Sequence, residues 1–263
     1  MSQIVIDNVQ KVFKAKDREV VALRDINLEI RKGEFVCLLG PSGCGKSTLL
    51  NAVAGFAPPT GGQITVDGRV ITEPGPDRGM VFQEYALFPW MTVAQNVAFG
   101  LEIQKKSKVE IERTVHDLLG LLNLKDFRDR FPKDLSGGMR QRVAIARILA
   151  LDSPIMLMDE PFGALDALTR RNLQDEVLRI WSTLGKTILF VTHSIEESIY
   201  LADRIVVMTY RPGTVKRDQI VEIERPRDPA SPEFNELKRE LGRLVMEEQQ
   251  RHAADEMKLA VVD

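Results

Sequence analysis

Residues 40 to 48 read Gly-Pro-Ser-Gly-Cys-Gly-Lys-Ser-Thr, with glycines at positions 40 and 45 and Lys46-Ser47 directly after the second. This is the pattern of a phosphate-binding loop. The flanks suit it, because 34–39 is a short, mainly apolar run typical of a buried strand and 47–54 has the composition of a helix. Glycines let successive backbone N–H groups point at an anion, and the helix start adds partial positive charge. We therefore predict a triphosphate-binding loop made of Gly40, Pro41, Ser42, Gly43, Cys44, Gly45, Lys46, Ser47 and Thr48.

Two side chains of this loop have specific roles in such a site. Lys46 is expected to reach the β- and γ-phosphates, and the Ser47 hydroxyl is expected to ligate Mg²⁺. The alternative is a glycine-rich turn with an exposed lysine. The strand, loop and helix context argues against that alternative.

The composition is that of an ordinary globular protein, with 44% hydrophobic and 28% charged residues among 263. A formal charge of −2 argues against a nucleic-acid scaffold. Cys37 and Cys44 lie in the predicted strand and the loop, which favours reduced thiols over a disulfide framework or a metal site. No apolar run approaches the ~20 residues of a membrane-spanning helix, so we expect any work at a membrane to involve partner subunits.

The N-terminal region predicts an antiparallel β layer. Segments 4–12 and 21–30 alternate apolar and polar residues, and the charged stretch 14–19 is expected to be the turn between them. Phe13 precedes this turn. Its side chain could stack on an adenine ring, or it could be a core residue at the end of a strand. The sequence pattern alone leaves both interpretations open.

A helical insertion follows further along the chain. The apolar strand 80–82 ends at Gln83, and helical spacing then runs through 92–103 and 109–122, with the insertion continuing to about Asp134.

Leu135 to Arg142 reads Leu-Ser-Gly-Gly-Met-Arg-Gln-Arg and leads into a helical segment. Ser136, Gly137 and Gly138 would lie at the N-terminus of that helix and make a second anion site. A Ser-Gly-Gly helix cap is commonplace by itself, but here it accompanies a complete phosphate loop.

Carboxylates follow the next apolar strand, 155–158, at Asp159 and Glu160. The carboxyl edge of an α/β sheet is where ligand chemistry is placed. Asp159 is expected to hold the Mg²⁺ shell, and Glu160 to orient or deprotonate the attacking water. Asp166 is expected to cap a helix over 167–184.

The β-rich run 187–191 ends at Thr192-His193, and His193 is assigned to the γ-phosphate because of this position. His116 and His252 are expected at the surface. Later segments predict closing strands over 204–208 and 214–223, a proline-rich linker over 226–232, and a charged helix from Glu233 to about Arg251. We expect that helix to lie on the domain as a solvated amphipathic helix, with a partner contact as the alternative.

The ordered set of motifs resembles the ATP-binding cassette (ABC) ATPases over essentially the whole chain. The Ser-Gly-Gly signature separates this family from other phosphate-loop ATPases. Segments 74–83, 87–90, 96–100, 162–166 and 211–213 are similar to the nitrate, sulfonate and taurine type of bacterial importer.

The resemblance implies an α/β fold: a phosphate-loop NTPase core with a mixed sheet, an antiparallel β subdomain and a helical subdomain. We assign 1–86 and 152–225 to the core with its antiparallel β subdomain. Residues 87–151 are assigned to the helical subdomain that ends in the signature helix, and 226–263 to the linker and C-terminal charged helix.

The resemblance also implies a head-to-tail dimer, of identical or paralogous ATPase subunits. ATP would lie between the phosphate loop of one subunit and Ser136, Gly137, Gly138 and Asp166 of the other. Phe13 would be the adenine platform, and Gln83 would contact Mg²⁺ or the water. Catalysis would rest on Lys46, Gln83, Glu160 and His193.

By resemblance, transmembrane permease subunits would dock near Gln83 and residues 85–90. An extracytoplasmic substrate-binding protein would act with these subunits. The chain would then lie on the cytoplasmic face of the inner membrane. No nucleic-acid partner is expected. The alternatives are a cassette ATPase of another importer or an exporter, a soluble cassette ATPase acting on DNA or the ribosome, and a phosphate-loop kinase or transferase.

Overall fold

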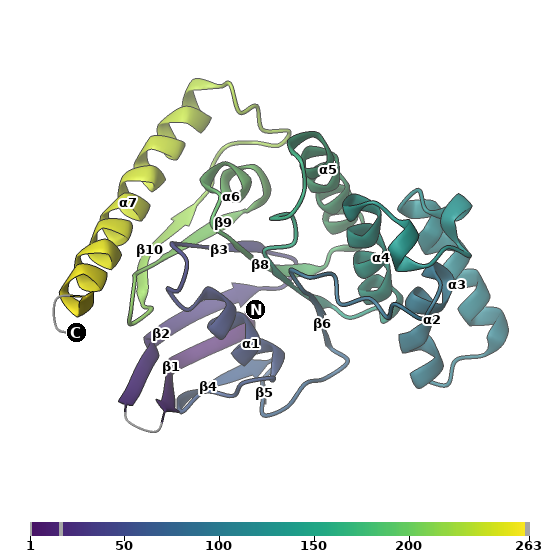
Figure 1. The fold of residues 1–263 in the computed structure, drawn as a ribbon, viewed down its shortest axis with the longest axis horizontal. Helices are drawn as coiled ribbons and strands as arrows, with labels where there is room; N and C mark the ends of the chain where they lie inside the picture. Colours follow the sequence, from purple (N-terminus) through teal and green to yellow (C-terminus); the bar gives the residue numbers. More distant parts are fainter. Residues whose placement is uncertain (1, 16–17, 261–263) are drawn as a thin grey trace. The chain divides into compact units, whose positions relative to one another are not determined.

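The structure is a computed structural model that describes residues 2–15 and 18–260, and the chain forms two compact units. Unit 1 comprises residues 1–75 and 187–263, and unit 2 comprises 76–186. The elements of both are labelled in Figure 1.

Unit 1 begins with an antiparallel sheet in the order β2-β1-β4-β5. Its strands are β1 (Ser2–Ala15), β2 (Arg18–Arg31), β4 (Gly61–Val66) and β5 (Arg69–Val70). Ile4 and Ile6 of β1 are buried, as period-two alternation requires where one face of a sheet is packed, and a register shift between Ile6 and Val9 moves the alternation so that Val9 is buried too. The predicted turn over 14–19 is too long, because pairing continues from Lys14 to Glu19 and from Ala15 to Arg18.

The second sheet of unit 1 carries parallel strands in its centre. The order β10-β9-β3-β8 is built from β3 (Phe35–Leu39), β8 (Thr187–Thr192), β9 (Arg204–Met208) and β10 (Val215–Ile220). β3 pairs in parallel with β8 and β9, and β10 is antiparallel to β9, so the sheet is mixed as predicted. All residues of β3 and β8 are buried, which explains their continuous apolar sequence. β10 ends earlier than the predicted residue 223.

Short helices follow two of these strands, α1 (Lys46–Ala54) after β3 and α6 (Ile195–Leu201) after β8. The chain then runs through a linker to α7 (Pro232–Ala260), which is longer than predicted. Phe234, Leu241 and Val245 of α7 are buried, and α7 packs against α6 and β9. The linker is fastened by buried Arg227, whose guanidinium donates to the carbonyls of Ile199 and Ala202 at 2.6 Å each.

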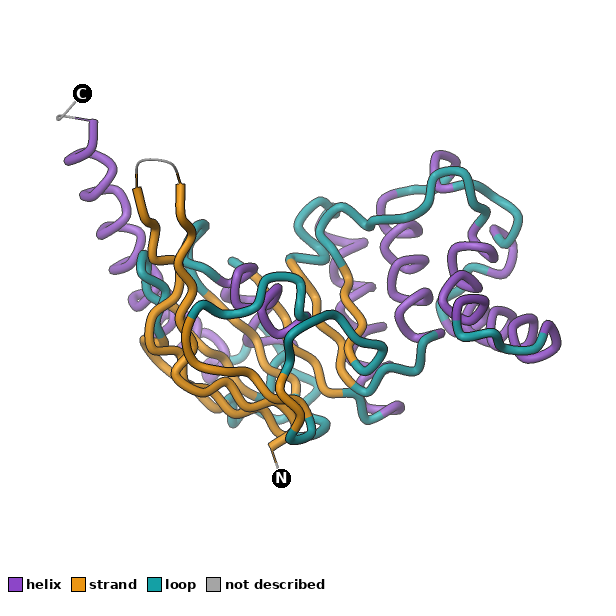
Figure 2. The backbone as a smooth tube through the Cα atoms, turned by 90° about the horizontal axis from the view of Figure 1, so that it is seen from below, coloured by secondary structure: helices purple, strands orange, loops and turns teal. Residues whose placement is uncertain are grey.

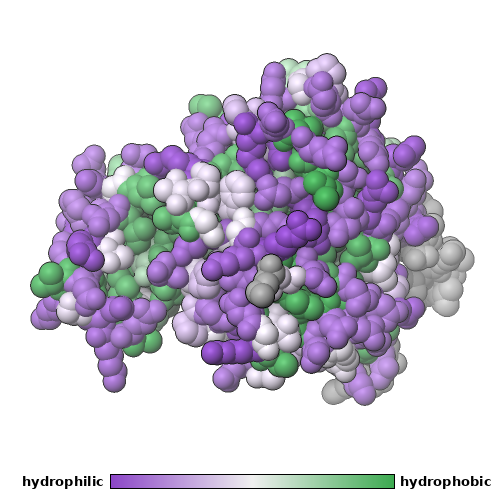
Figure 3. Space-filling model, turned by 180° about the vertical axis from the view of Figure 1, so that it is seen from behind, coloured by the Kyte–Doolittle hydropathy of each residue, from purple (hydrophilic) through white to green (hydrophobic). Residues whose placement is uncertain are grey.

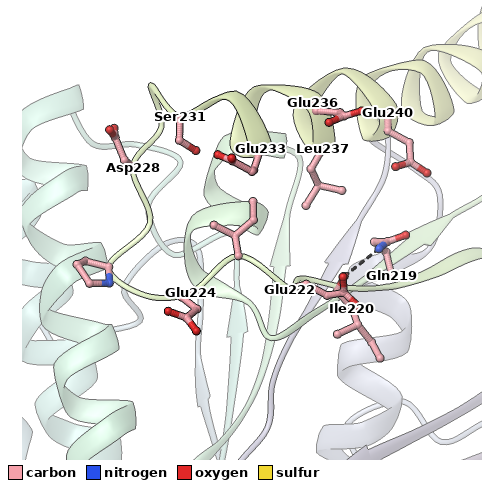
Figure 4. Close-up of a pocket in the computed structure, with 12 residues that line it drawn as sticks. Gln219, Ile220, Glu222, Glu224, Asp228, Ser231, Glu233, Glu236, Leu237 and Glu240 are labelled. Carbon is pink, nitrogen blue, oxygen red and sulfur yellow. Dashed lines mark hydrogen bonds between the residues drawn. The ribbon is translucent and has the colours of Figure 1, made fainter.

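A cavity of about 650 Å³ lies between the linker region and the first half of α7 (Figure 4). Carboxylates dominate its polar lining, with apolar side chains between them. The acidic residues are Glu222, Glu224, Asp228, Glu233, Glu236 and Glu240.

Unit 2 combines a parallel strand pair with helices (Figure 2). The strands are β6 (Arg78–Val81) and β7 (Ile155–Asp159). The helices are α2 (Val93–Ile103), α3 (Lys108–Leu121), α4 (Gly137–Ala150) and α5 (Ala167–Leu184), with short 3₁₀ turns at Lys125–Phe127 and Pro132–Asp134. Thr92 and Ser107 start α2 and α3 with complete capping boxes.

The surface of unit 2 carries exposed apolar side chains. Hydrophobic residues gather over its helices at the left of the space-filling view (Figure 3). Trp90 is 71% exposed and Val109 80%. Among the described residues, no helix is both long and apolar enough to span a bilayer.

Candidate functional site

The phosphate loop joins the end of β3 to the start of α1, as the sequence predicted. Gly43 and Gly45 adopt positive φ angles of 77° and 98°. At Gly45 a side chain would also collide, because a Cβ there would lie 2.7 Å from Leu23 Cδ2 and 3.0 Å from the Ala22 carbonyl. Only glycine satisfies both conditions, and the result is a loop folded over the N-terminus of α1.

Lys46 is almost fully buried within this loop. Its Nζ donates to the Gly40 carbonyl at 2.7 Å and to the Pro41 carbonyl at 2.9 Å. The ammonium group is therefore held inside the curl of the backbone, at the N-terminal start of α1. A buried positive charge in such a cradle fits a phosphate chain.

Cys44 is also buried in the loop, and its Sγ lies 3.8 Å from Lys46 Nζ. Burial raises the pKa of its thiol, although the neighbouring ammonium opposes the rise. Cys37 in β3 is buried too, and both cysteines are free in the structure.

His193 lies at the sheet edge that also carries the phosphate loop. Leu39 of β3 pairs with Thr192 of β8, so Gly40 and His193 follow the ends of adjacent parallel strands. His193 is exposed there. Phe13 lies in the β1–β2 hairpin of the same unit with its side chain 47% exposed, and Lys11 Nζ lies 5.4 Å from its ring centroid.

In unit 2, Gln83 and the two carboxylates follow neighbouring strands in the same way. Val81 of β6 pairs with Met158 of β7, so the parallel register brings Gln83 and Asp159-Glu160 to one sheet edge. A Cβ at Gly163 would lie 4.0 Å from Gln83 Nε2, which places the segment after Glu160 beside Gln83.

Glu160 has a φ of 42°, in the left-handed region that non-glycine residues rarely enter. Strained backbone of this kind clusters at functional sites. Eight other described non-glycine residues, among them Asp25, Asp67 and Asp152, also have a positive φ, so it is the position after β7 together with the angle that distinguishes this carboxylate.

The signature turn begins α4 as predicted. The exposed Ser136 side chain accepts a hydrogen bond from the Met139 N–H at 3.3 Å and caps the helix. A Cβ on Gly138 would lie 2.4 Å from Thr169 Cγ2, so the first turn of α4 packs closely against α5. Asp166 caps α5 by accepting from the Thr169 N–H at 3.0 Å, and this bond lowers the pKa of its carboxyl.

Sequence reasoning missed the residues that fasten the segment after Gln83. Asn96 of α2 is fully buried, and its side chain binds the backbone of residues 88–92 through four hydrogen bonds. The Phe88 ring packs in a tilted geometry against Phe99 and Trp90, with ring centroids 4.5 and 5.8 Å away. A polar residue on the apolar face of a predicted helix was the available signal for Asn96.

These features define a phosphate-loop nucleotide-binding protein with an additional Ser-Gly-Gly helix start. The family model for ABC transporters matches residues 23–163. The chain is 48% identical to the nitrate import ATP-binding protein of Synechocystis sp., over 89% of this chain and 88% of that protein. It is 49% identical to the taurine import ATP-binding protein of Roseobacter denitrificans, over 83% and 82% of the two chains.

A solved ATP-binding cassette in a dimeric post-hydrolysis state, bound to ADP and Pi, has a TM-score of 0.75 and 33% identity, covering 84% of this chain and all of that one. The chain therefore belongs to the ABC transporter family, and it is an ATP-hydrolysing cassette subunit. The predictions of family, fold class and ATPase activity are confirmed.

Proposed function

We propose that the chain is the ATPase subunit of a bacterial importer and that it binds ATP at Gly40–Thr48. The observation that carries the proposal is the pair of anion-binding helix starts in one chain: the Lys46 loop before α1 and the Ser136 cap of α4. A phosphate-loop kinase or transferase needs only the first of them. A cassette that closes as a head-to-tail dimer uses both, the second in trans.

The remaining roles follow from the positions of the side chains. Lys46 stabilises charge on the β- and γ-phosphates, and His193, from the adjacent strand end, faces the γ-phosphate. Glu160 orients or deprotonates the attacking water, with Gln83 beside it on the same sheet edge. Phe13 supplies an exposed aromatic face for the adenine ring.

Ser136, Gly137, Gly138 and Asp166 form the surface that receives the partner's nucleotide. Ser136 and Asp166 are the N-caps of α4 and α5, and Gly137 and Gly138 begin α4, at helix ends whose first backbone N–H groups have no partner within the helix. Gly137 packs closely against its neighbours, because a Cβ there would lie 3.1 Å from Tyr85 Oη and 3.3 Å from Leu165 Cδ2.

Mg²⁺ would be held by oxygen ligands: the Ser47 hydroxyl, the Asp159 carboxylate and the Gln83 amide oxygen. Hydroxyl, carboxylate and amide oxygens suit a hard divalent cation that also contacts substrate phosphates. The ion would neutralise negative charge on the phosphates. Among residues 2–15 and 18–260, no three His, Cys, Asp or Glu side chains cluster as a metal site.

The segment 85–90 is the proposed contact with the permease subunits. Trp90 projects from it with 71% of its surface exposed, while Asn96 fixes its backbone. A rigid aromatic side chain on a fixed backbone is typical of a protein interface. Permease docking places the chain at the cytoplasmic face of the inner membrane, and an extracytoplasmic binding protein would deliver the substrate.

The transported substrate is proposed from the relatives, as a small anion or a sulfonate. The named relatives import nitrate and taurine. This subunit lies away from the transport path, so permease and binding protein determine which compound is carried.

The first test is the molar mass of Glu160→Gln protein by light scattering, with and without Mg²⁺-ATP. We expect this variant to bind ATP, to form a dimer only with ATP, and to turn over at least about 100-fold more slowly than the wild type. Lys46→Ala is the matched control and should stay monomeric because it binds ATP poorly. Undiminished turnover by Glu160→Gln would refute the role of Glu160, and a monomer with ATP bound would refute the sandwich dimer of this chain.

A further inference from the structure

The phosphate loop is contacted from outside by the loop between β9 and β10, residues 209–214, here named the hairpin loop. Arg211 Nε donates to the Gly43 carbonyl at 3.4 Å, and Arg211 Nη2 lies 3.6 Å from the Cβ position of Gly43. Gly213 approaches Cys44 so closely that a Cβ on it would lie 2.2 Å from the Cys44 carbonyl. The hairpin loop therefore packs directly on the backbone of Gly43 and Cys44.

The hairpin loop is closed by its own hydrogen bonds and is also tied to β2. Thr209 Oγ1 donates to the Pro212 carbonyl at 2.8 Å and accepts from the Thr214 N–H at 2.9 Å. The Gly213 N–H donates to the Ala22 carbonyl at 2.9 Å. The hairpin loop is therefore restrained both by its own hydrogen bonds and by its contact with β2.

The other end of the hairpin loop is held by α7. Glu248 has a fully buried side chain, and it accepts from the Tyr210 N–H at 2.9 Å and from Lys216 Nζ at 2.7 Å. Burial would raise the pKa of Glu248, but hydrogen bonds from Lys216 and from the Tyr210 N–H outweigh it and lower the pKa. The carboxylate is thus charged and paired.

An aromatic contact reinforces the same attachment. His252 of α7, expected at the surface, is only partly exposed and meets the Tyr210 ring edge-on with centroids 4.1 Å apart. The Arg211 guanidinium lies 5.8 Å from the same ring centroid. Tyr210 therefore contacts α7 and the residue that reaches Gly43.

We propose that α7 positions the phosphate loop: Glu248 holds Tyr210, and Arg211 then holds Gly43, so both are positioning residues for nucleotide binding. The proposal rests on the proposed binding of ATP at Gly40–Thr48. It assigns the C-terminal helix a part in the ATPase, in addition to covering the sheet. Arg211 also brings a positive charge beside the loop that receives the triphosphate.

The test is the Kd of Mg²⁺-ATP for the full chain by calorimetry, together with KM and kcat. Arg211→Ala should weaken ATP binding about tenfold, and Glu248→Gln about fivefold, as expected for directly coupled neighbours. Both should raise KM and leave kcat within about twofold of the wild type. Arg211→Lys should restore part of the affinity, because it keeps the charge.

Glu247→Gln is the matched control. Glu247 also binds Lys216, at 2.7 Å, so this variant removes a charge from the same lysine while the Glu248–Tyr210 bond stays in place. Its Kd should equal that of the wild type. Because the two proposed residues act in series, Glu248→Gln should have no added effect on Kd in an Arg211→Ala background.

Wild-type affinity in both Arg211→Ala and Glu248→Gln would overturn the proposal, as would an equal loss in Glu247→Gln. Fully additive effects would overturn the series arrangement. Failure of the nucleotide site itself is distinguishable, because Lys46→Ala would then bind ATP as the wild type does.

Discussion

Asn96→Ala should loosen the segment 88–91 without changing the nucleotide site. The Asn96 side chain accepts from the Phe88 N–H at 2.9 Å and donates to the carbonyls of Phe88, Met91 and Thr92 at 3.0 to 3.2 Å. The Phe88 and Thr92 carbonyls keep backbone donors from Met91 and Asn96 after the substitution. The loss therefore falls on the Phe88 N–H and the Met91 carbonyl.

The magnitude follows from these two groups. Each loses a net contribution of about 1 kcal/mol or somewhat more when its partner is removed from a buried site. Alanine returns roughly 0.5 kcal/mol through its higher helix propensity. The expected net cost is about 2 kcal/mol, which corresponds to about 30-fold faster local opening.

Hydrogen exchange measured on a peptide covering 86–92 tests this directly, because it reports local opening. The matched control is Asn235→Ala in α7, where Nδ2 donates to the carbonyls of Pro229 and Ser231 at a more exposed site. It should leave exchange in 86–92 unchanged. The reasoning is refuted if Asn96→Ala accelerates exchange there less than about threefold, or if it weakens ATP binding as strongly as it loosens the segment.

Three further outcomes are expected. Ser136→Arg should bind ATP as a monomer but fail to form the ATP-dependent dimer. Light scattering on the variant in the Glu160→Gln background checks this, and dimer formation would contradict the role of Ser136 in trans. Gly138→Val should lower the melting temperature and the dimer yield, because even a Cβ would lie 2.4 Å from Thr169 Cγ2; an unchanged melting curve would contradict this. The stability that Glu248 contributes through Lys216, Arg251 and the Tyr210 N–H should be fully present above about pH 4.5, the ordinary pKa of its carboxyl, and disappear as the pH falls through its lowered pKa. Melting curves of wild type and Glu248→Gln should therefore converge in acid, and a constant difference down to pH ~3 would contradict the pairing.

Much of the candidate site was predictable because its parts are local. A phosphate loop needs only a strand, its glycines and a helix start, and Ser136 and Asp166 cap the helices that their sequences predicted. The expectation that ligand-binding residues follow the carboxyl ends of parallel strands also applies here. The strand register brings Gly40 beside His193 and Gln83 beside Asp159. These positions depend on sequence patterns of a few residues.

The misses share a different physical cause. Glu248 is one acid among many in a charged helix, and its burial depends on Tyr210 and Lys216, which lie 38 and 32 positions earlier. Arg211 meets Gly43 across 168 positions. A side chain that binds a distant backbone group leaves no periodic pattern, so neither contact could be predicted from spacing or composition. The extended β1–β2 pairing was missed because charged residues in an exposed hairpin resemble a turn.

The two kinds of residue should separate in kinetic experiments. Residues predicted from motifs, such as Glu160, are proposed to meet the reacting atoms, so their loss should lower kcat with ATP affinity retained. Residues whose contacts only the structure shows, such as Arg211 and Glu248, are proposed to act on the shape of the phosphate loop before the reaction begins. Their loss should appear as weaker ATP binding with kcat preserved, because the same groups complete the site once ATP is bound. On this proposal, the long-range polar contacts of α7 would set the ATP affinity of the cassette, and the motif residues would set its rate of hydrolysis.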